Sequence, residues 1–145
     1  MSRTPRRNIF LSAIALALPF ATLAVSQSPQ AFRHHVVFQM SEPEAEWRPL
    51  LAHVMNLRAA FQKDGGVEIE IVFFGPGINM LRKSNVDFAE NLKRLAGQGV
   101  TLSACQNSMR DRGIGTEDLF PFAGQVDSGV AQLARRQEAG WAYIK

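Results

Sequence analysis

The sequence has 145 residues, of which 46% are hydrophobic, a composition that suits one domain with a buried core and excludes a largely disordered chain. The formal net charge of +3 equals the contribution of Arg3, Arg6 and Arg7, and the first acidic residue is Glu42. From Gln27 onward, 13 basic residues balance 13 acidic ones. The balanced charge of this part of the chain argues against nucleic-acid binding, which needs an excess of basic side chains to contact phosphates.

The first 26 residues have the parts of an export signal peptide. A basic start with Arg6–Arg7 precedes an apolar run over residues 9–25, and small and polar residues follow. The arginine pair resembles that of a twin-arginine signal, and the general secretory route is the alternative. Cleavage after Ala24 or Ser26 would release an exported, periplasmic protein, whereas an uncleaved apolar run would anchor the chain to a membrane.

Strands and helices alternate along the rest of the chain, where residues 27–33 are predicted to be a connector and residues 34–145 a single domain. Short apolar and β-branched runs predict strands over residues 35–40, 67–74, 100–105 and 141–144. Apolar residues at three- and four-residue steps predict helices over residues 47–63, 85–95 and 129–138, with a shorter helix over 106–112. Residues 112–127 show no clear pattern. The order predicts an α/β fold in three layers, with a mostly parallel, doubly wound sheet of about four to five strands and helices on both faces.

The only cysteine, Cys105, is the last residue of the third predicted strand. Ligands of parallel sheets collect beyond the carboxyl ends of the strands. If a helix begins at Gln106, its free N–H groups would favour the thiolate over the thiol. The alternative is a buried cysteine that only fills space. In an oxidising compartment an unpaired cysteine is expected to be buried, paired between chains or used, and these three outcomes stay open.

Few other residues suggest chemistry. Gly75-Pro76-Gly77 ends another strand, so it is either a tight turn or a turn whose N–H groups bind an anion. No nucleotide-binding glycine motif is present. His34 and His35 precede the first strand and His53 lies in the first helix, a spacing unlike that of a structural zinc site. No metal and no cofactor are therefore predicted.

Four segments of the predicted domain resemble the DsrE/DsrF-like family. They are residues 35–40, 72–78, 103–109 and 137–144. The specific features are Asn107 and Met109 at two and four places after Cys105, and the closing run Gly140-Trp141-Ala142-Tyr143. The resemblance implies a doubly wound domain that assembles into trimers or hexamers and handles sulfur, with Cys105 carrying a persulfide. Sulfur-relay members of the family act in the cytoplasm with partner subunits, whereas this chain is predicted to be exported.

The leading hypothesis is a sulfur-handling protein in which Cys105 accepts sulfane sulfur from a small sulfur compound or a donor protein and passes it on. Whether this is catalytic turnover, as in a sulfurtransferase, stays open. One alternative is a non-enzymatic homo-oligomer with a structural cysteine. Its ligand site would involve Gly75, Pro76, Gly77, Gln106 and Asn107. Another alternative is a thiol redox sensor, although the chain has no second cysteine to resolve an oxidised one.

Overall fold

The computed structural model describes Phe32 and residues 34–145. The predicted export signal over residues 1–26 lies outside the described residues, as does the connector over residues 27–33 apart from Phe32. Within the described part of the chain, no helix combines the length and the apolar character needed to span a bilayer.

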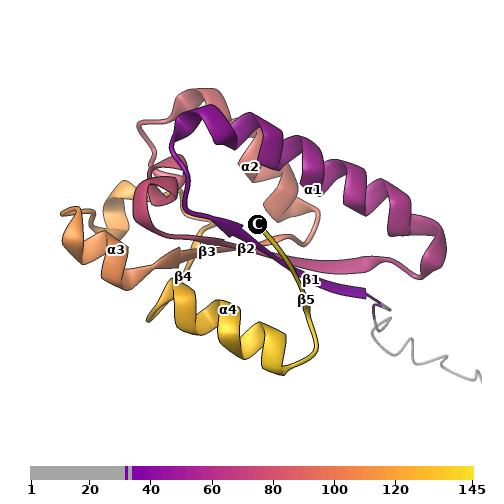
Figure 1. Cartoon of the computed structure of the whole chain (residues 1–145). Helices are drawn as coiled ribbons and strands as arrows, with labels where there is room; N and C mark the ends of the chain where they lie inside the picture. The colour runs from indigo at the N-terminus through magenta and orange to yellow at the C-terminus, as the bar shows by residue number, and fades with distance from the viewer. Residues whose placement is uncertain (1–31, 33) are drawn as a thin grey trace, which may run out of the picture. The chain divides into compact units, whose positions relative to one another are not determined.

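Five parallel strands form a single sheet in the order β4-β3-β2-β1-β5 (Figure 1). The strands are β1 (His34–Met40), β2 (Val67–Phe73), β3 (Thr101–Cys105), β4 (Gly124–Val126) and β5 (Ala142–Ile144). The predicted α/β fold with a parallel sheet is confirmed. The strand that the sequence did not reveal is β4. It has only three residues and includes a glycine, so it is too short to show an apolar alternation.

Four α-helices connect the strands, and the two faces of the sheet are covered unequally. The helices are α1 (Trp47–Phe61), α2 (Val86–Gly97), α3 (Gln106–Asp111) and α4 (Gly129–Glu138). Short 3-10 helices cover Glu44–Glu46, Gln62–Asp64, Gly75–Leu81 and Thr116–Asp118. The chain steps from β1 to β2 to β3 in one direction, so right-handed crossovers place α1 and α2 on the same face (Figure 1). From β4, at one edge, α4 leads back to β5 at the other edge, and it therefore covers the opposite face.

The main hydrophobic core lies between the sheet and helices α1 and α2. Phe38 of β1, Phe73 of β2 and Leu92 of α2 belong to it and are at most 2% exposed. Alternate residues of each strand point to this core because successive side chains of a strand face opposite ways. Burial of these large apolar side chains is the principal stabilising contribution to the fold.

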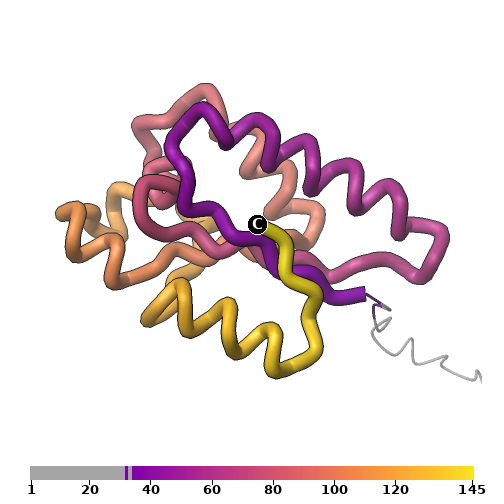
Figure 2. The backbone as a smooth tube through the Cα atoms, viewed as in Figure 1, coloured from indigo at the N-terminus to yellow at the C-terminus, as the bar shows by residue number. Residues whose placement is uncertain are grey.

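The other sheet face, called here the α4 face, is thinly covered and of mixed character. Its apolar cluster consists of Val37, Val72 and Leu133. The C-terminal segment runs from α4 into β5, and β5 lies beside β1, as the tube in Figure 2 shows. The described residues with buried polar or charged side chains are Glu70 and Ser103, and both belong to the α4 face because they contact side chains of α4 or each other.

Candidate functional site

Cys105 is the last residue of β3, and α3 begins at the next residue. Its neighbours Leu102 and Ala104 contribute to the main core, so the alternation along β3 directs Ser103 and Cys105 to the α4 face. Cys105 is only 4% exposed and is a free thiol. The structure thus places the thiol where the sequence predicted it, at the carboxyl end of a strand and directly before a helix.

Two opposing effects act on the pKa of Cys105, and their sum lowers it. Burial is the largest single effect and raises the pKa of the thiol, because the thiolate loses solvation. Hydrogen bonding from the backbone N–H groups of Ser108, Gly129 and Asn107 and from the Ser108 side chain lowers the pKa, and together these contributions exceed the effect of burial. The site therefore favours the thiolate, which is the nucleophilic form of cysteine.

Ser108 links the thiol to the turn after β2. The backbone N–H of Gly75 donates a hydrogen bond to Ser108 Oγ at 2.9 Å. With its oxygen accepting this bond, the hydroxyl hydrogen of Ser108 is free to point at the Cys105 sulfur. Gly75, a residue predicted for the site, therefore contributes to it indirectly, because its N–H already has a partner within the protein.

Gly129, the first residue of α4, approaches the thiol from the other side. Cys105 pairs with Val126 in the β3–β4 ladder, which brings the start of α4 close to the end of β3. The side chain of Ser128 caps α4 by accepting a hydrogen bond from the N–H of Ala131. A Cβ at position 129 would lie 2.9 Å from Phe74 Cδ1, so only glycine allows α4 to begin this close to the sheet. The thiol thus receives N–H groups from the starts of two helices.

Comparison with known proteins identifies the family of this domain. The model of the DsrE/DsrF-like family matches residues 34–145. The chain belongs to the DsrE/DsrF-like family. No curated protein shows a significant match to the chain.

Two solved structures are similar to this DsrE/DsrF-like domain. The first is a protein of unknown function, MTH1491, from Methanobacterium thermoautotrophicum. It is 37% identical, with a TM-score of 0.71 over 77% of this chain and 97% of that one. The second is the ychN protein from E. coli, at 13% identity and a TM-score of 0.61 over the same shares of the two chains. At that identity the second match supports the fold alone.

The other residues predicted for the ligand site of this DsrE/DsrF-like domain have separate roles. A Cβ on Gly77 would lie 2.3 Å from the backbone oxygen of Met40, so Gly77 allows close packing against the end of β1. Pro76 lines a shallow cavity that is also bordered by Trp47. Gln106 is exposed and donates a side-chain hydrogen bond to Gln125 at 3.3 Å.

Asn107 contributes to the site through its backbone. Its N–H is one of the groups that lower the pKa of Cys105, whereas its side chain is exposed and accepts a hydrogen bond from Arg110. The side-chain amide of Asn107 is therefore directed along α3. Of the residues predicted for ligand binding, Asn107 contributes directly to the thiol environment, and Gly75 does so through Ser108.

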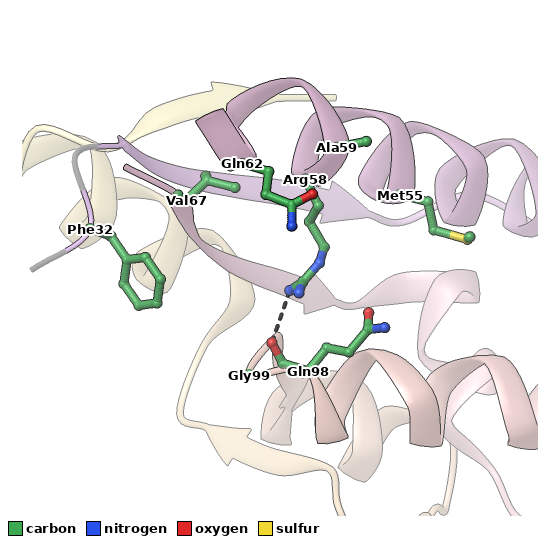
Figure 3. Close-up of a pocket in the computed structure, with 9 residues that line it drawn as sticks. Phe32, Met55, Arg58, Ala59, Gln62, Val67, Gln98 and Gly99 are labelled. Atoms are coloured by element: carbon green, nitrogen blue, oxygen red, sulfur yellow. Dashed lines mark hydrogen bonds between the residues drawn. The ribbon is translucent and has the colours of Figure 1, made fainter. Parts of the chain in front are cut away.

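Another cavity of the domain, drawn in Figure 3, lies at the amino end of the sheet. It has a volume of about 400 Å³. Its walls come from helix α1 and from the segments around the starts of β1, β2 and β3, which include Phe32, Val67 and Gly99. Arg58 crosses it to donate a hydrogen bond to the backbone oxygen of Gln98 at 2.9 Å (Figure 3). Because these residues lie at the amino ends of the strands, this cavity is separate from Cys105.

The histidines of the domain lie away from the thiol. His34 stacks on Phe61 with ring centroids 4.0 Å apart, and His35 lies 3.5 Å from Glu68 at the amino end of the sheet. His53 is in α1, across the sheet from Cys105. In the part of the chain that the structure describes, no three His, Cys, Asp or Glu side chains group as a metal site.

Sequence reasoning did not single out Ser108 or Gly129. Ser108 lies in the segment that carries the family resemblance, and a hydroxyl in the first turn of a helix that follows a cysteine is a signal that could have identified it. Gly129 is 24 positions after Cys105 and reaches the thiol only through the three-residue strand β4. Because β4 was not predicted, neither was the contribution of α4 to the site.

Proposed function

We propose that this domain handles sulfur through Cys105, whose thiolate accepts a sulfane sulfur atom and passes it on as a persulfide. The observation that carries this proposal is a lone thiol at the carboxyl end of β3 whose pKa is lowered by N–H groups from two helices. Membership of the DsrE/DsrF-like family agrees with it. The role proposed is that of a sulfur carrier or transferase, with a small sulfur compound or another protein as donor and acceptor.

The proposed transfer needs no external oxidant or reductant. With thiosulfate as donor, the Cys105 thiolate attacks the outer sulfur, the sulfur–sulfur bond of the donor breaks, and sulfite leaves with the bonding electrons. Cys105 then carries a persulfide anion. An acceptor thiolate attacks the outer sulfur of that persulfide, and Cys105 leaves again as a thiolate. The N–H groups around the sulfur stabilise this leaving group, and a low thiol pKa speeds its departure.

The test is the mass of the intact protein after exposure to a donor. The reduced full chain is incubated with polysulfide or thiosulfate, desalted and weighed. We expect the added mass of one sulfur atom on the native chain and none on Cys105→Ser. Absence of added mass on the native chain, or the same addition on the variant, would contradict the proposal.

A second candidate rests on the burial of Cys105, which leaves 4% of the residue exposed. In this case the cysteine is structural and the domain is an oligomeric ligand-binding protein. It predicts that small alkylating reagents leave the native thiol unmodified, whereas the sulfur-handling proposal predicts modification that slows in Ser108→Ala at neutral pH. Rapid formation of a sulfenic acid with peroxide, without sulfur uptake, would instead favour a thiol redox sensor.

We further propose a homo-oligomer, a trimer or a hexamer, as the family resemblance implies. The thin cover of the α4 face supports this, since Val130 and Tyr143 remain 66% and 40% exposed. Light scattering coupled to size-exclusion chromatography measures the mass of the assembly, and a monomer at all concentrations would contradict it.

We also propose that the chain is exported to the periplasm. The support is the basic and apolar character of residues 1–26. Cell fractionation with and without residues 1–26 tests this proposal, and an unchanged distribution would contradict it.

A further inference from the structure

A buried carboxylate joins three elements of the α4 face. Glu70 of β2 is 1% exposed. It accepts a hydrogen bond from Ser103 Oγ of β3 at 2.6 Å, and bonds from Gln132 Nε2 of α4 at 3.0 and 3.1 Å to its two oxygens. Arg136 of α4 donates to it through Nε and forms an ion pair with it.

The same two elements that hold Glu70 also form the walls of the Cys105 site. On β3, Ser103 and Cys105 are two residues apart and face the same way. On α4, Gly129, Gln132 and Arg136 are separated by three and four residues, a spacing that places them on one stripe of the helix. The same side of α4 therefore approaches the thiol at Gly129 and contacts Glu70 at Gln132 and Arg136.

Helix α4 is held on this face by the polar network as well as by apolar packing. Leu133 is the one residue of α4 in the cluster of buried apolar residues on this face. Glu70, in contrast, receives donors from two successive turns of α4, and the Arg136 guanidinium is itself stacked over the Trp141 ring at 4.2 Å from its centroid. A buried carboxylate requires such partners, because an unpaired buried charge is strongly unfavourable.

We propose that Glu70 is a positioning residue for Cys105: by holding Gln132 and Arg136 it fixes α4 so that the first residue of this helix, Gly129, stays close to the Cys105 sulfur. The inference rests on the proposed reactivity of Cys105, but its test uses no sulfur donor. If sulfur uptake fails and the test below succeeds, the proposed function is wrong and the positioning role of Glu70 stands.

The experiment is an ultraviolet titration of the thiolate in the reduced full chain. Cys105 is the only cysteine, so subtracting the titration of Cys105→Ser isolates its signal from that of Tyr143. The test variants are Gln132→Ala and Glu70→Gln. The matched control is Glu68→Gln, because Glu68 precedes Glu70 by two residues on β2, its side chain is 40% exposed and its ion-pair partner is His35 of β1.

Gln132→Ala is the decisive variant because it removes an uncharged side chain and favours helix formation. We expect the titration midpoint to move to higher pH and the thiolate fraction at neutral pH to fall about threefold to tenfold, since one hydrogen bond to the charged sulfur weakens. Glu70→Gln should shift the midpoint in the same direction, and Glu68→Gln should leave it unchanged.

A pure charge effect predicts the opposite sign for Glu70→Gln. Removing the carboxylate leaves Arg136 without its partner, and an added positive charge favours the thiolate. Among the other titratable groups of this face, His35 lies beside Glu68 at the amino end of the sheet, while Asp127 and Arg135 pair with each other before and within α4. An unchanged or lowered midpoint in Gln132→Ala would overturn the proposal, and this variant decides the matter alone if Glu70→Gln does not fold.

Discussion

The two faces of the sheet are made by the same strands but bury different kinds of side chain. Beneath α1 and α2, the buried residues are apolar and form one continuous cluster. On the α4 face, an apolar cluster of three buried residues adjoins Glu70, Ser103 and Cys105. The first face contributes most of the apolar burial, and the second face buries polar side chains and a free thiol.

The difference between the faces follows from how each one is held together. The apolar driving force is non-directional, so the main core holds the sheet against α1 and α2 without orienting polar groups. Hydrogen bonds to Glu70 are directional, and they specify where α4 lies relative to β2 and β3. A thiol whose ionisation depends on N–H groups from two helices is therefore found on the face where polar contacts set the geometry.

The largest expected effect tests whether the main core carries the stability. Phe73 is fully buried in that core, and Leu133 is 6% exposed in the small cluster. Phe73→Ala should lower the free energy of unfolding by about 3–5 kcal/mol, and Leu133→Ala by about 2 kcal/mol, the lower end for such truncations. Urea denaturation followed by circular dichroism measures both. If Leu133→Ala lost as much free energy of unfolding as Phe73→Ala or more, the main core would not carry more of the stability than the α4 face.

A smaller effect tests the polar contacts of the α4 face. Glu70→Ala leaves the donors of Ser103 and Gln132 without their acceptor and opens a cavity on the α4 face, and we expect a loss of about 3 kcal/mol. Glu68→Ala, on the same strand and face, should change the free energy of unfolding by less than about 0.5 kcal/mol, as surface substitutions do. Similar losses for the two variants in the same denaturation assay would show that the buried contacts of Glu70 stabilise the fold no more than the exposed contacts of Glu68 do.

The fold and the thiol position were predictable because they depend on local patterns. Each α-helix of the structure coincides with a predicted one, and the long strands show apolar runs that the main core requires. The predicted place of Cys105, between a strand and a helix, follows from Gly99 before that strand and from the polar residues after it.

The polar contacts of the α4 face were not predictable for a physical reason. Glu68 and Glu70 alternate with apolar residues and look alike in the sequence, yet one is half-exposed and the other is 1% exposed. What separates them is α4, whose residues Gln132 and Arg136 lie 62 and 66 positions after Glu70 and contact it. Contacts between residues that are distant in sequence leave no periodic signal.

The smallest expected effect is the pH dependence of stability that Cys105 contributes. Because the folded state lowers the pKa of this thiol, folding is favoured by ionisation. The contribution is fully present above the pKa of the unfolded thiol, about 8.5, and it is lost as the pH falls through the pKa of the folded state. The free energy of unfolding of the native chain should therefore rise with pH over that interval relative to Cys105→Ser, and the difference should be constant at higher pH.

Urea denaturation of both chains in reductant, at several pH values from neutral to alkaline, measures this difference. Ser108→Ala provides the internal control, because removing a hydroxyl that stabilises the thiolate should reduce the pH-dependent part without abolishing it. A difference that falls as the pH rises would mean that burial outweighs the N–H groups around the sulfur. In that case the α4 face would protect a neutral thiol, and its polar contacts would serve the position of α4 without activating Cys105.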